Sequence, residues 1–304
     1  MSMLRFFGCL ILTSLVLYSS ACRSTPQGGE AASLDVLATT TIIADVVRQV
    51  GGEAIHVSAL LPVGTDPHAF SPTPQDIARV VQADLIFTNG AGLEEFLSSM
   101  IESAGSAEKV VDLSNGIKLI SSAEDEGHQA GDPHVWTDPN NVLIWVQTIT
   151  TALKNADPSN SSLYEQNAQH YREELTNLDA WIVAQVAQSP PEERVIVSDH
   201  RFFSYFARRY GFQQVEAIIP SFSSLAEPSA RDLAALEDFI RQHQVRAILV
   251  GTSANPALAQ RISQDTGIRL VTIYTGSLSA AGGEADNYLD YMRFNVRAIM
   301  SSLK

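Results

Sequence analysis

Short apolar runs alternate with helical patterns along the chain from Leu34 onward. Four runs rich in β-branched residues occupy the first half, at 34–41, 54–61, 83–90 and 109–114. Four more occupy the second half, at 194–198, 214–219, 246–252 and 269–275. Alternation of strands and helices is typical of parallel sheets covered by helices. The pattern therefore predicts an α/β protein with two lobes, each a mostly parallel four-stranded sheet with flanking helices.

One uninterrupted helical pattern separates the two sets of strands. Residues 159–188 contain no Gly or Pro. Apolar side chains recur there near helical spacing, at Leu163, Tyr171, Leu175, Leu178, Ile182 and Val186. A helix of about 30 residues measures roughly 45 Å, which suits a rigid rod between lobes. We therefore expect an N-terminal lobe at 34–158, a bridging helix at 159–190 and a C-terminal lobe at 191–304.

The segment 1–22 has the pattern of a secretory signal peptide. Arg5 precedes an apolar run, and small residues follow up to Cys22. The Ser-Ser-Ala before Cys22 resembles a bacterial lipoprotein cleavage site, although Ser19 stands where Leu is usual. The only other cysteine lies inside the leader, so lipid attachment explains a lone exported Cys22. A cut just after Cys22 is the alternative. Residues 23–33 are small and polar, as in a linker.

The formal net charge of −14 makes nucleic acid and anionic membrane surfaces poor partners. Cations are better partners, although an acidic surface also serves solubility alone. After the leader, the sequence contains no segment long and apolar enough to span a membrane.

Two histidines share a local pattern, in "TDPHAF" at 65–70 and "GDPHVW" at 131–136. His68 follows a predicted strand, and His134 precedes a helix whose predicted cap is Asp138. A third histidine, His200, follows an apolar strand in "RVIVSDHRFF". Loops between strands and helices meet at the carboxyl edge of an open α/β sheet, where ligands bind. Two facing lobes would bring His68 and His134 against His200.

Three imidazoles suit a metal of borderline softness such as Zn²⁺. Asp66 and Asp132, before the prolines, can accept hydrogen bonds from the second ring nitrogen of the first two histidines. The spacing alone is a weak signal, because the chain contains no His-Glu-x-x-His motif and no cysteine pair. We interpret the other histidines as ordinary structural or surface residues: His56, His128, His170 and His243.

Five longer stretches carry a resemblance to a known family. They are "GTDPHAFSPTPQDI", "DPHVWTDPNN", "SDHRFFSYFARRYG", "PSFSSLAEPSARDLAAL" and "YTGSLSAAGGEADNYLDYMRFNV". In this order, over roughly 34–300, they resemble the metal-binding receptor lipoproteins of bacterial zinc and manganese ABC importers, the zinc-uptake family of cluster A-I. The resemblance implies metal ligands at His68, His134 and His200. In such proteins the third position is His in zinc-type members and often Glu in manganese-type members.

The resemblance also implies a role for the whole chain. We expect an exported monomer, lipid-anchored at Cys22 on the outer face of the cytoplasmic membrane or in the periplasm. It would capture Zn²⁺ between its lobes, with small lobe movements, and deliver it to a membrane permease. A manganese receptor of the same family is one alternative. A zinc-dependent hydrolase is another, because catalytic zinc also has three protein ligands and an open position. A surface adhesin on the same scaffold is the third.

Two positions depart from the family pattern. Gly276, in "YTGSLS", stands where an aspartate is usual, and Gly251 with Thr252 stands where many relatives carry a glutamate. Glu284 and Asp286 are the nearest acidic residues in sequence, but neither is predicted as a ligand. The loss of two carboxylates favours Zn²⁺ over Mn²⁺, which prefers oxygen ligands. The loop 123–132 lies where zinc-type relatives often have a metal-collecting loop, but we interpret it as a solvated acidic turn.

Overall fold

The computed structural model describes residues 33–121, 131–212 and 214–304. The predicted signal peptide with Cys22 and nearly all of the linker 23–33 lie outside the described residues. Most of the acidic loop 123–132, including His128, lies outside them too. In the described part of the chain, no helix is both long enough and apolar enough to cross a bilayer.

The N-terminal sheet contains the four predicted strands, all parallel. They are β1 (Leu34–Ala38), β2 (Ile55–Ala59), β3 (Leu85–Thr88) and β4 (Val110–Asp112), in the spatial order β2-β1-β3-β4. The helices of this lobe are α1 (Thr41–Gly51), α2 (Pro74–Gln82) and α3 (Leu97–Ala104). α2 begins at the predicted cap, because the side chains of Thr73 and Asp76 accept each other's backbone N–H groups.

The C-terminal sheet repeats this arrangement. It contains β5 (Val195–His200), β6 (Gln214–Ile219), β7 (Ala247–Gly251) and β8 (Arg269–Ile273), all parallel, in the order β6-β5-β7-β8. Its helices are α6 (Ser204–Tyr210), α7 (Ala230–Gln242), α8 (Ala257–Thr266) and α9 (Tyr288–Ser302). α8 begins at Ala257, one residue later than the pattern Asn255-Pro256 predicts, although the Asn255 side chain accepts the N–H of Ala257 as a capping residue does.

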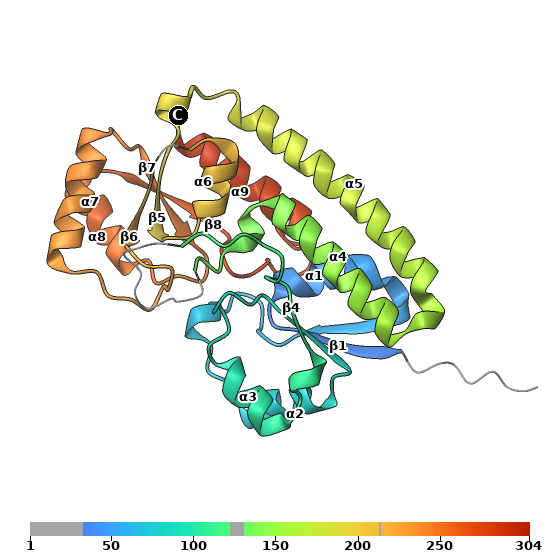
Figure 1. The fold of residues 1–304 in the computed structure, drawn as a ribbon. Helices are drawn as coiled ribbons and strands as arrows, with labels where there is room; N and C mark the ends of the chain where they lie inside the picture. The colour runs from blue at the N-terminus through green and yellow to red at the C-terminus, as the bar shows by residue number, and fades with distance from the viewer. Residues whose placement is uncertain (1–32, 122–130, 213) are drawn as a thin grey trace, which may run out of the picture. The chain divides into compact units, whose positions relative to one another are not determined.

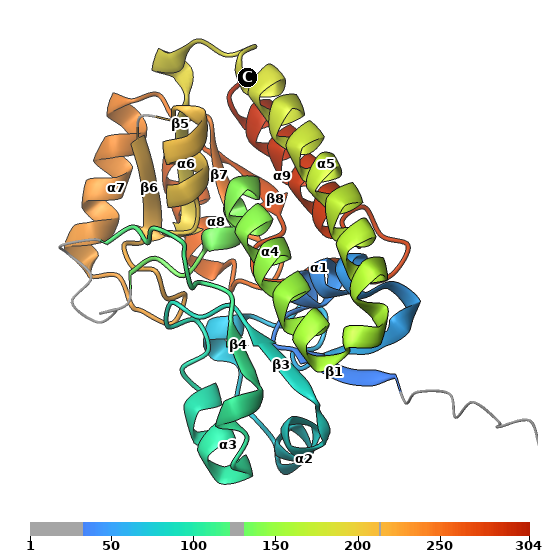
Figure 2. The same cartoon turned by 45° about the vertical axis from the view of Figure 1, so that its right-hand side comes forward.

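The predicted long helix is α5 (Ser161–Val186), which follows α4 (Pro139–Ala156). Figures 1 and 2 show α5 running beside α4 and α9, from the N-terminal lobe to the segment that leads into β5. Of the six apolar residues that recur at helical spacing in the sequence, five are buried, but Leu163 is 38 % exposed. Tyr164 is buried instead, because the buried stripe of α5 begins one position later than the apolar pattern suggests.

The apolar core has three parts. An outer cluster lies between the N-terminal sheet and α2 and α3, and a second lies between the C-terminal sheet and α7 and α8. The third and largest contains residues of both sheets together with α1, α4, α5, α6 and α9. Since side chains alternate between the two faces of a strand, each sheet contributes one face to this shared core. The two lobes are therefore joined by continuous packing as well as by α5.

Candidate metal site

The three predicted histidines meet where the two lobes face each other. His68 lies in a 3₁₀ turn (Pro67–Ala69) between β2 and α2, and His134 immediately precedes the turn Val135–Thr137 that leads into α4. His200 is the last residue of β5, and not a loop residue as the sequence suggested. The Nε2 atom of His134 lies 3.2 Å from that of His68 and 3.4 Å from that of His200.

These histidines offer nitrogen ligands only. Their ligand atoms all lie within 4.8 Å of one another, and in the described ranges no other histidine, cysteine or carboxylate group forms such a cluster. The cavity they line with Pro67 and Trp136 measures about 10 Å³. This is room for about one water-sized particle, so the site fits a bare ion and excludes a larger ligand.

Aromatic rings keep the inner part of the site dry. His134 is 1 % exposed and His200 is 4 % exposed, whereas His68 is half-buried. The His134 ring lies 5.4 Å from the Trp136 ring and 5.0 Å from the Phe202 ring, centroid to centroid. Charges interact more strongly in such surroundings than in water. A cation held by the histidines would therefore feel the nearby carboxylates strongly.

Two carboxylates fix the inner histidine rings. Asp132 Oδ1 lies 2.8 Å from His134 Nδ1, and Asp199 Oδ1 lies 2.7 Å from His200 Nδ1. A ring that donates from Nδ1 has Nε2 available as a metal ligand. The ring contact predicted for Asp132 is confirmed. That of Asp199 was missed, because an adjacent residue in a strand usually points to the other face.

Asp66, the other predicted acceptor, has different partners in the structure. Its Oδ1 accepts the backbone N–H of His68 at 3.0 Å, and its Oδ2 accepts the hydroxyl of Ser224 at 2.6 Å. Ser224 belongs to the C-terminal lobe. Asp66 therefore connects the backbone of the His68 turn to the opposite lobe.

The buried carboxylates also change the proton affinity of the site. Burial lowers the pKa of His200, but the carboxylate of Asp199, helped by those of Asp66 and Asp132, outweighs burial and raises this pKa above its usual value. Burial raises the pKa of Asp199, but His200 and the N–H of Gly251 outweigh burial and lower it. The same carboxylates that favour a proton on His200 would favour a metal cation there.

The two glycine positions have no room for a side chain in this structure. A Cβ atom at Gly276 would lie 2.4 Å from Cδ of Pro67, and one at Gly251 would lie 2.7 Å from Oγ1 of Thr275. Neither Glu284 nor Asp286 belongs to the cluster of ligand atoms; Asp286 accepts the N–H of Gly282 in its own loop. Gly276 therefore lets Pro67, and with it the His68 turn, approach the C-terminal lobe closely.

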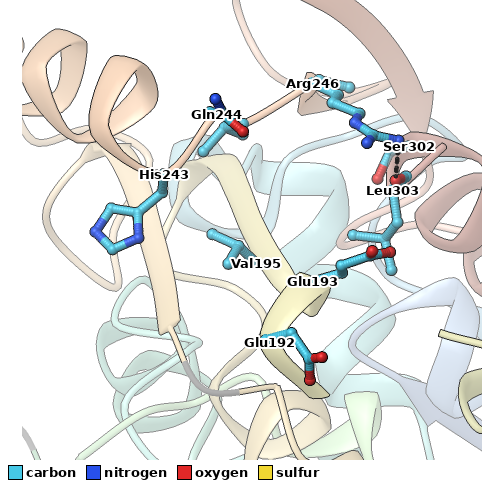
Figure 3. Close-up of a pocket in the computed structure, with 10 residues that line it drawn as sticks. Glu192, Glu193, Val195, His243, Gln244, Arg246, Ser302 and Leu303 are labelled. Atoms are coloured by element: carbon cyan, nitrogen blue, oxygen red, sulfur yellow. Dashed lines mark hydrogen bonds between the residues drawn. The ribbon is translucent and has the colours of Figure 1, made fainter. Parts of the chain in front are cut away.

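A separate hollow of about 220 Å³ lies at the opposite edge of the C-terminal sheet (Figure 3). Its lining includes Val195 and Ala247, at the amino ends of β5 and β7, whereas His200 ends β5 at the carboxyl edge. His243 lines this hollow and stacks on Phe239, with ring centroids 4.3 Å apart. Figure 3 shows Glu192, Glu193 and His243 spread around the hollow, and among the described residues they form no metal-ligand cluster.

Comparison with known proteins gives consistent matches over nearly the whole chain. The model of the family "Zinc-uptake complex component A periplasmic" (ZnuA) matches residues 36–302. The manganese-binding lipoprotein MntA of Halalkalibacterium halodurans is 30 % identical over 295 residues, covering 97 % of this chain and 96 % of the relative. The manganese ABC transporter substrate-binding lipoprotein PsaA of Streptococcus anginosus is 32 % identical over 302 residues, covering 97 % of each chain.

A solved structure matches the fold as well. The periplasmic zinc-binding protein TroA of Treponema pallidum superposes with a TM-score of 0.83 at 27 % sequence identity. The match covers 89 % of this chain and 99 % of TroA. The fold predicted from the strand pattern is thereby confirmed.

Proposed function

The chain belongs to the periplasmic zinc-uptake component A family, the metal-binding receptors of ABC importers, and we propose that Zn²⁺ is the ion it carries. It is an extracytoplasmic binding receptor and not an enzyme. Its partners are a metal ion and a membrane permease. We propose that His68, His134 and His200 are the protein ligands of the ion.

One observation carries the choice of zinc, namely a cluster of three imidazole nitrogens that no carboxylate of the described residues joins. Zn²⁺ accepts nitrogen ligands in a four-coordinate site, whereas Mn²⁺ prefers oxygen ligands. Most of the relatives' names point to manganese, whereas that of TroA points to zinc, so the choice of zinc depends on the site of this chain. A carboxylate at Gly276 or Gly251 would need Pro67 or Thr275 to move, which argues for a nitrogen-only site in this chain.

A competition titration of the purified protein, beginning after Cys22, is the first test. We expect one Zn²⁺ bound per chain and much weaker binding of Mn²⁺. Because Zn²⁺ binds most sites more tightly than Mn²⁺, the titration does not identify the cargo by itself. Chelation of Zn²⁺ from the growth medium should therefore arrest cells that lack the chain, and the wild-type gene should rescue them.

The His68→Ala variant completes this test in cells. We expect it to fail to restore growth in zinc-poor medium, while the exposed-residue variant His170→Ala restores it fully. Rescue of manganese-starved cells, with no effect on zinc-starved cells, would identify Mn²⁺ as the cargo. Rescue of both by His68→Ala would exclude transport through the three histidines.

We propose in addition that Cys22 carries the lipid anchor. The relatives MntA and PsaA are named lipoproteins, and the only other cysteine, Cys9, lies inside the apolar run of the leader. A Cys22→Ala variant should lose labelling by a fatty-acid analogue and leave the membrane fraction. Membrane attachment that survives this substitution would disprove the assignment.

A further inference from the structure

A larger cavity lies directly beside the metal site. It measures about 390 Å³ and is lined by residues of both lobes, with Asp66 and Ala69 on one side and residues of two C-terminal loops on the other. It shares two lining residues, Asp66 and His200, with the small chamber around the histidines. These two side chains therefore stand between the larger cavity and the metal chamber.

One hydrogen bond closes this boundary. The hydroxyl of Ser224 donates to Oδ2 of Asp66 at 2.6 Å, and Oδ1 of the same carboxylate accepts the N–H of His68. Ser224 lines the larger cavity and is half-buried. The bond joins the loop 221–228 to the His68 turn across the two lobes, so its rupture would free both segments at the mouth of the site.

The other flank of the His68 turn is held more firmly. The N–H of Gly64 donates to Oγ of Ser277 at 2.8 Å, and Ser277 is only 3 % exposed. Pro67 packs against Gly276 without space for a Cβ atom. Beneath the histidines, Trp136 and Phe202 are fully buried. The half-buried Ser224 side is therefore the weakest part of the enclosure.

The chemistry of the larger cavity suits an approaching cation. Asp66, Asp199 and Glu227 are among its lining residues. Negative charge in a cleft raises the local concentration of cations and speeds their association. The cavity has room for an ion with its water shell, whereas the chamber of about 10 Å³ does not. An ion that passes from one to the other must lose water at the Asp66 boundary.

We propose that this cavity is the route by which the metal ion reaches and leaves the three histidines, with the Ser224–Asp66 hydrogen bond as its gate. The inference rests on the proposed metal-binding function and adds the path and the residue that controls it. A gate acts on the barrier between the bound and free states. Its loss therefore raises the association and dissociation rates together and changes the equilibrium affinity little.

Stopped-flow mixing of the purified protein with Zn²⁺ tests the gate. The rates can be followed by tryptophan fluorescence, since Trp136 lies against the His134 ring. For Ser224→Ala we expect both rates to rise about 10- to 100-fold, as for the loss of one hydrogen bond to a charged group. Ser224→Thr keeps a hydroxyl and should restore wild-type rates.

Ser223→Ala is the matched control, because within the described ranges the Ser223 hydroxyl bonds to the N–H of Leu225 in the same loop and to no residue of the other lobe. It should leave both rates unchanged. An increase confined to the dissociation rate of Ser224→Ala would show that the bond merely stabilises the loaded state. Unchanged rates in Ser224→Ala would also disprove the proposal that this hydrogen bond is a gate.

A second variant tests the route from the opposite direction. Ala254 lines the larger cavity, and Ala254→Phe would fill part of it without adding a tryptophan. Both rates should fall about tenfold or more, as expected when access needs a conformational opening. Unchanged rates would place the route elsewhere. A wild-type chain that binds no metal would refute the proposed function itself, whereas wild-type binding with these rates unchanged refutes only the route.

Discussion

His134 and His200 reach the candidate metal site from inside the molecule, whereas His68 reaches it on a turn held from outside. The inner pair is buried, and a carboxylate fixes each of its rings through Nδ1. The turn of His68 is held by Ser224 and Ser277, which belong to the opposite lobe. The inner pair should therefore determine how tightly the ion is held, and the outer turn how fast it comes and goes.

The packing around the two parts explains this difference. Val135 and Trp136, next to His134, and Phe202, close to His200, belong to the large core shared by the lobes. Dense cores resist displacement, so we expect the inner rings to remain in place when the ion leaves. The His68 turn rests on hydrogen bonds between lobes, and small relative movements are enough to break those.

Removal of an inner histidine should have the largest effect. We expect His200→Ala to lower Zn²⁺ affinity by more than about 100-fold, beyond the loss typical for a partner outside the coordination shell. His68→Ala should lose at least tenfold less than His200→Ala in the same competition titration. Equal losses, or a larger loss for His68→Ala, would break the distinction between the inner pair and the outer turn.

The loop that carries His134 also depends on a buried carboxyl group, that of Glu94. It accepts hydrogen bonds from Thr39 and from the N–H groups of Asn89 and Gly90, and the Asn89 side chain donates to the carbonyl of Pro133. Burial raises the pKa of Glu94 from 4.5 to about 7. Glu94 thus supports the residue that precedes His134, through a loop that is sensitive to its charge.

This raised pKa predicts a loss of stability with rising pH. Between pH 4.5 and about 7 the folded chain binds more protons than the unfolded chain, so the free energy of unfolding falls as pH rises through this window. The contribution lost is about 3 to 4 kcal/mol at most, at roughly 1.4 kcal/mol per pKa unit. Urea unfolding at a series of pH values measures it.

Glu94→Gln should remove this part of the pH dependence, because an amide does not titrate. The exposed neighbour supplies the control, and Glu95→Gln should retain the wild-type slope. The same slope in Glu94→Gln as in the wild-type chain would assign the pH dependence to other groups.

The carboxylates that orient the inner rings should come next in effect. We expect Asp132→Asn to lower Zn²⁺ affinity about 10- to 100-fold, the usual cost of a lost partner of a ligating histidine. Asp66→Asn should change the equilibrium affinity much less, because Asp66 contacts the backbone of His68 and Ser224. Titration of both variants in competition with the same chelator gives the ratio of their Zn²⁺ affinities. A greater loss in Asp66→Asn would reverse the assigned roles.

Much of the fold, and the convergence of the three histidines, could be predicted because they depend on local patterns. The eight strands, the capping box of α2 and the convergence of the histidines all follow from periodicity and from the position of loops at strand ends. Helix α5 was predicted within a few residues, but Leu163 was wrongly assigned to its buried face. Leu163 lies in the first turn of α5, where the periodic pattern has no preceding turn that would show which face is buried.

The contacts that enclose the site could not be predicted, because they join distant parts of the chain. Ser224 and Asp66 are 158 residues apart, and Ser277 and Gly64 are 213 residues apart. Nothing in the local sequence of either partner indicates the other. The ring contact of Asp199 was missed for a different reason, since Asp199 and His200 are neighbours in β5 and strand patterns place neighbouring side chains on opposite faces.

The contact of Gly276 with Pro67 gives the smallest expected effect and tests the outer turn alone. A methyl group at Gly276 would force the Pro67 ring to move, since neither partner has a flexible side chain. Overpacking of this kind costs roughly 1–3 kcal/mol. Part of that cost should be relieved by the half-buried His68 turn, so we expect Gly276→Ala to lower Zn²⁺ affinity only about fivefold.

A double-mutant cycle with Pro67→Ala shows whether the collision is the cause. If it is, Gly276→Ala should have little further effect in a Pro67→Ala background, and the two changes should not be additive. Additive effects would show that Gly276 acts through its backbone and not through Pro67. In both variants the inner rings should keep their carboxylate partners. The bonds that fix them join Asp132 to His134 and Asp199 to His200, and neither bond involves Gly276 or Pro67. A loss as large as that of Asp132→Asn would mean that the turn and the inner pair move as one body.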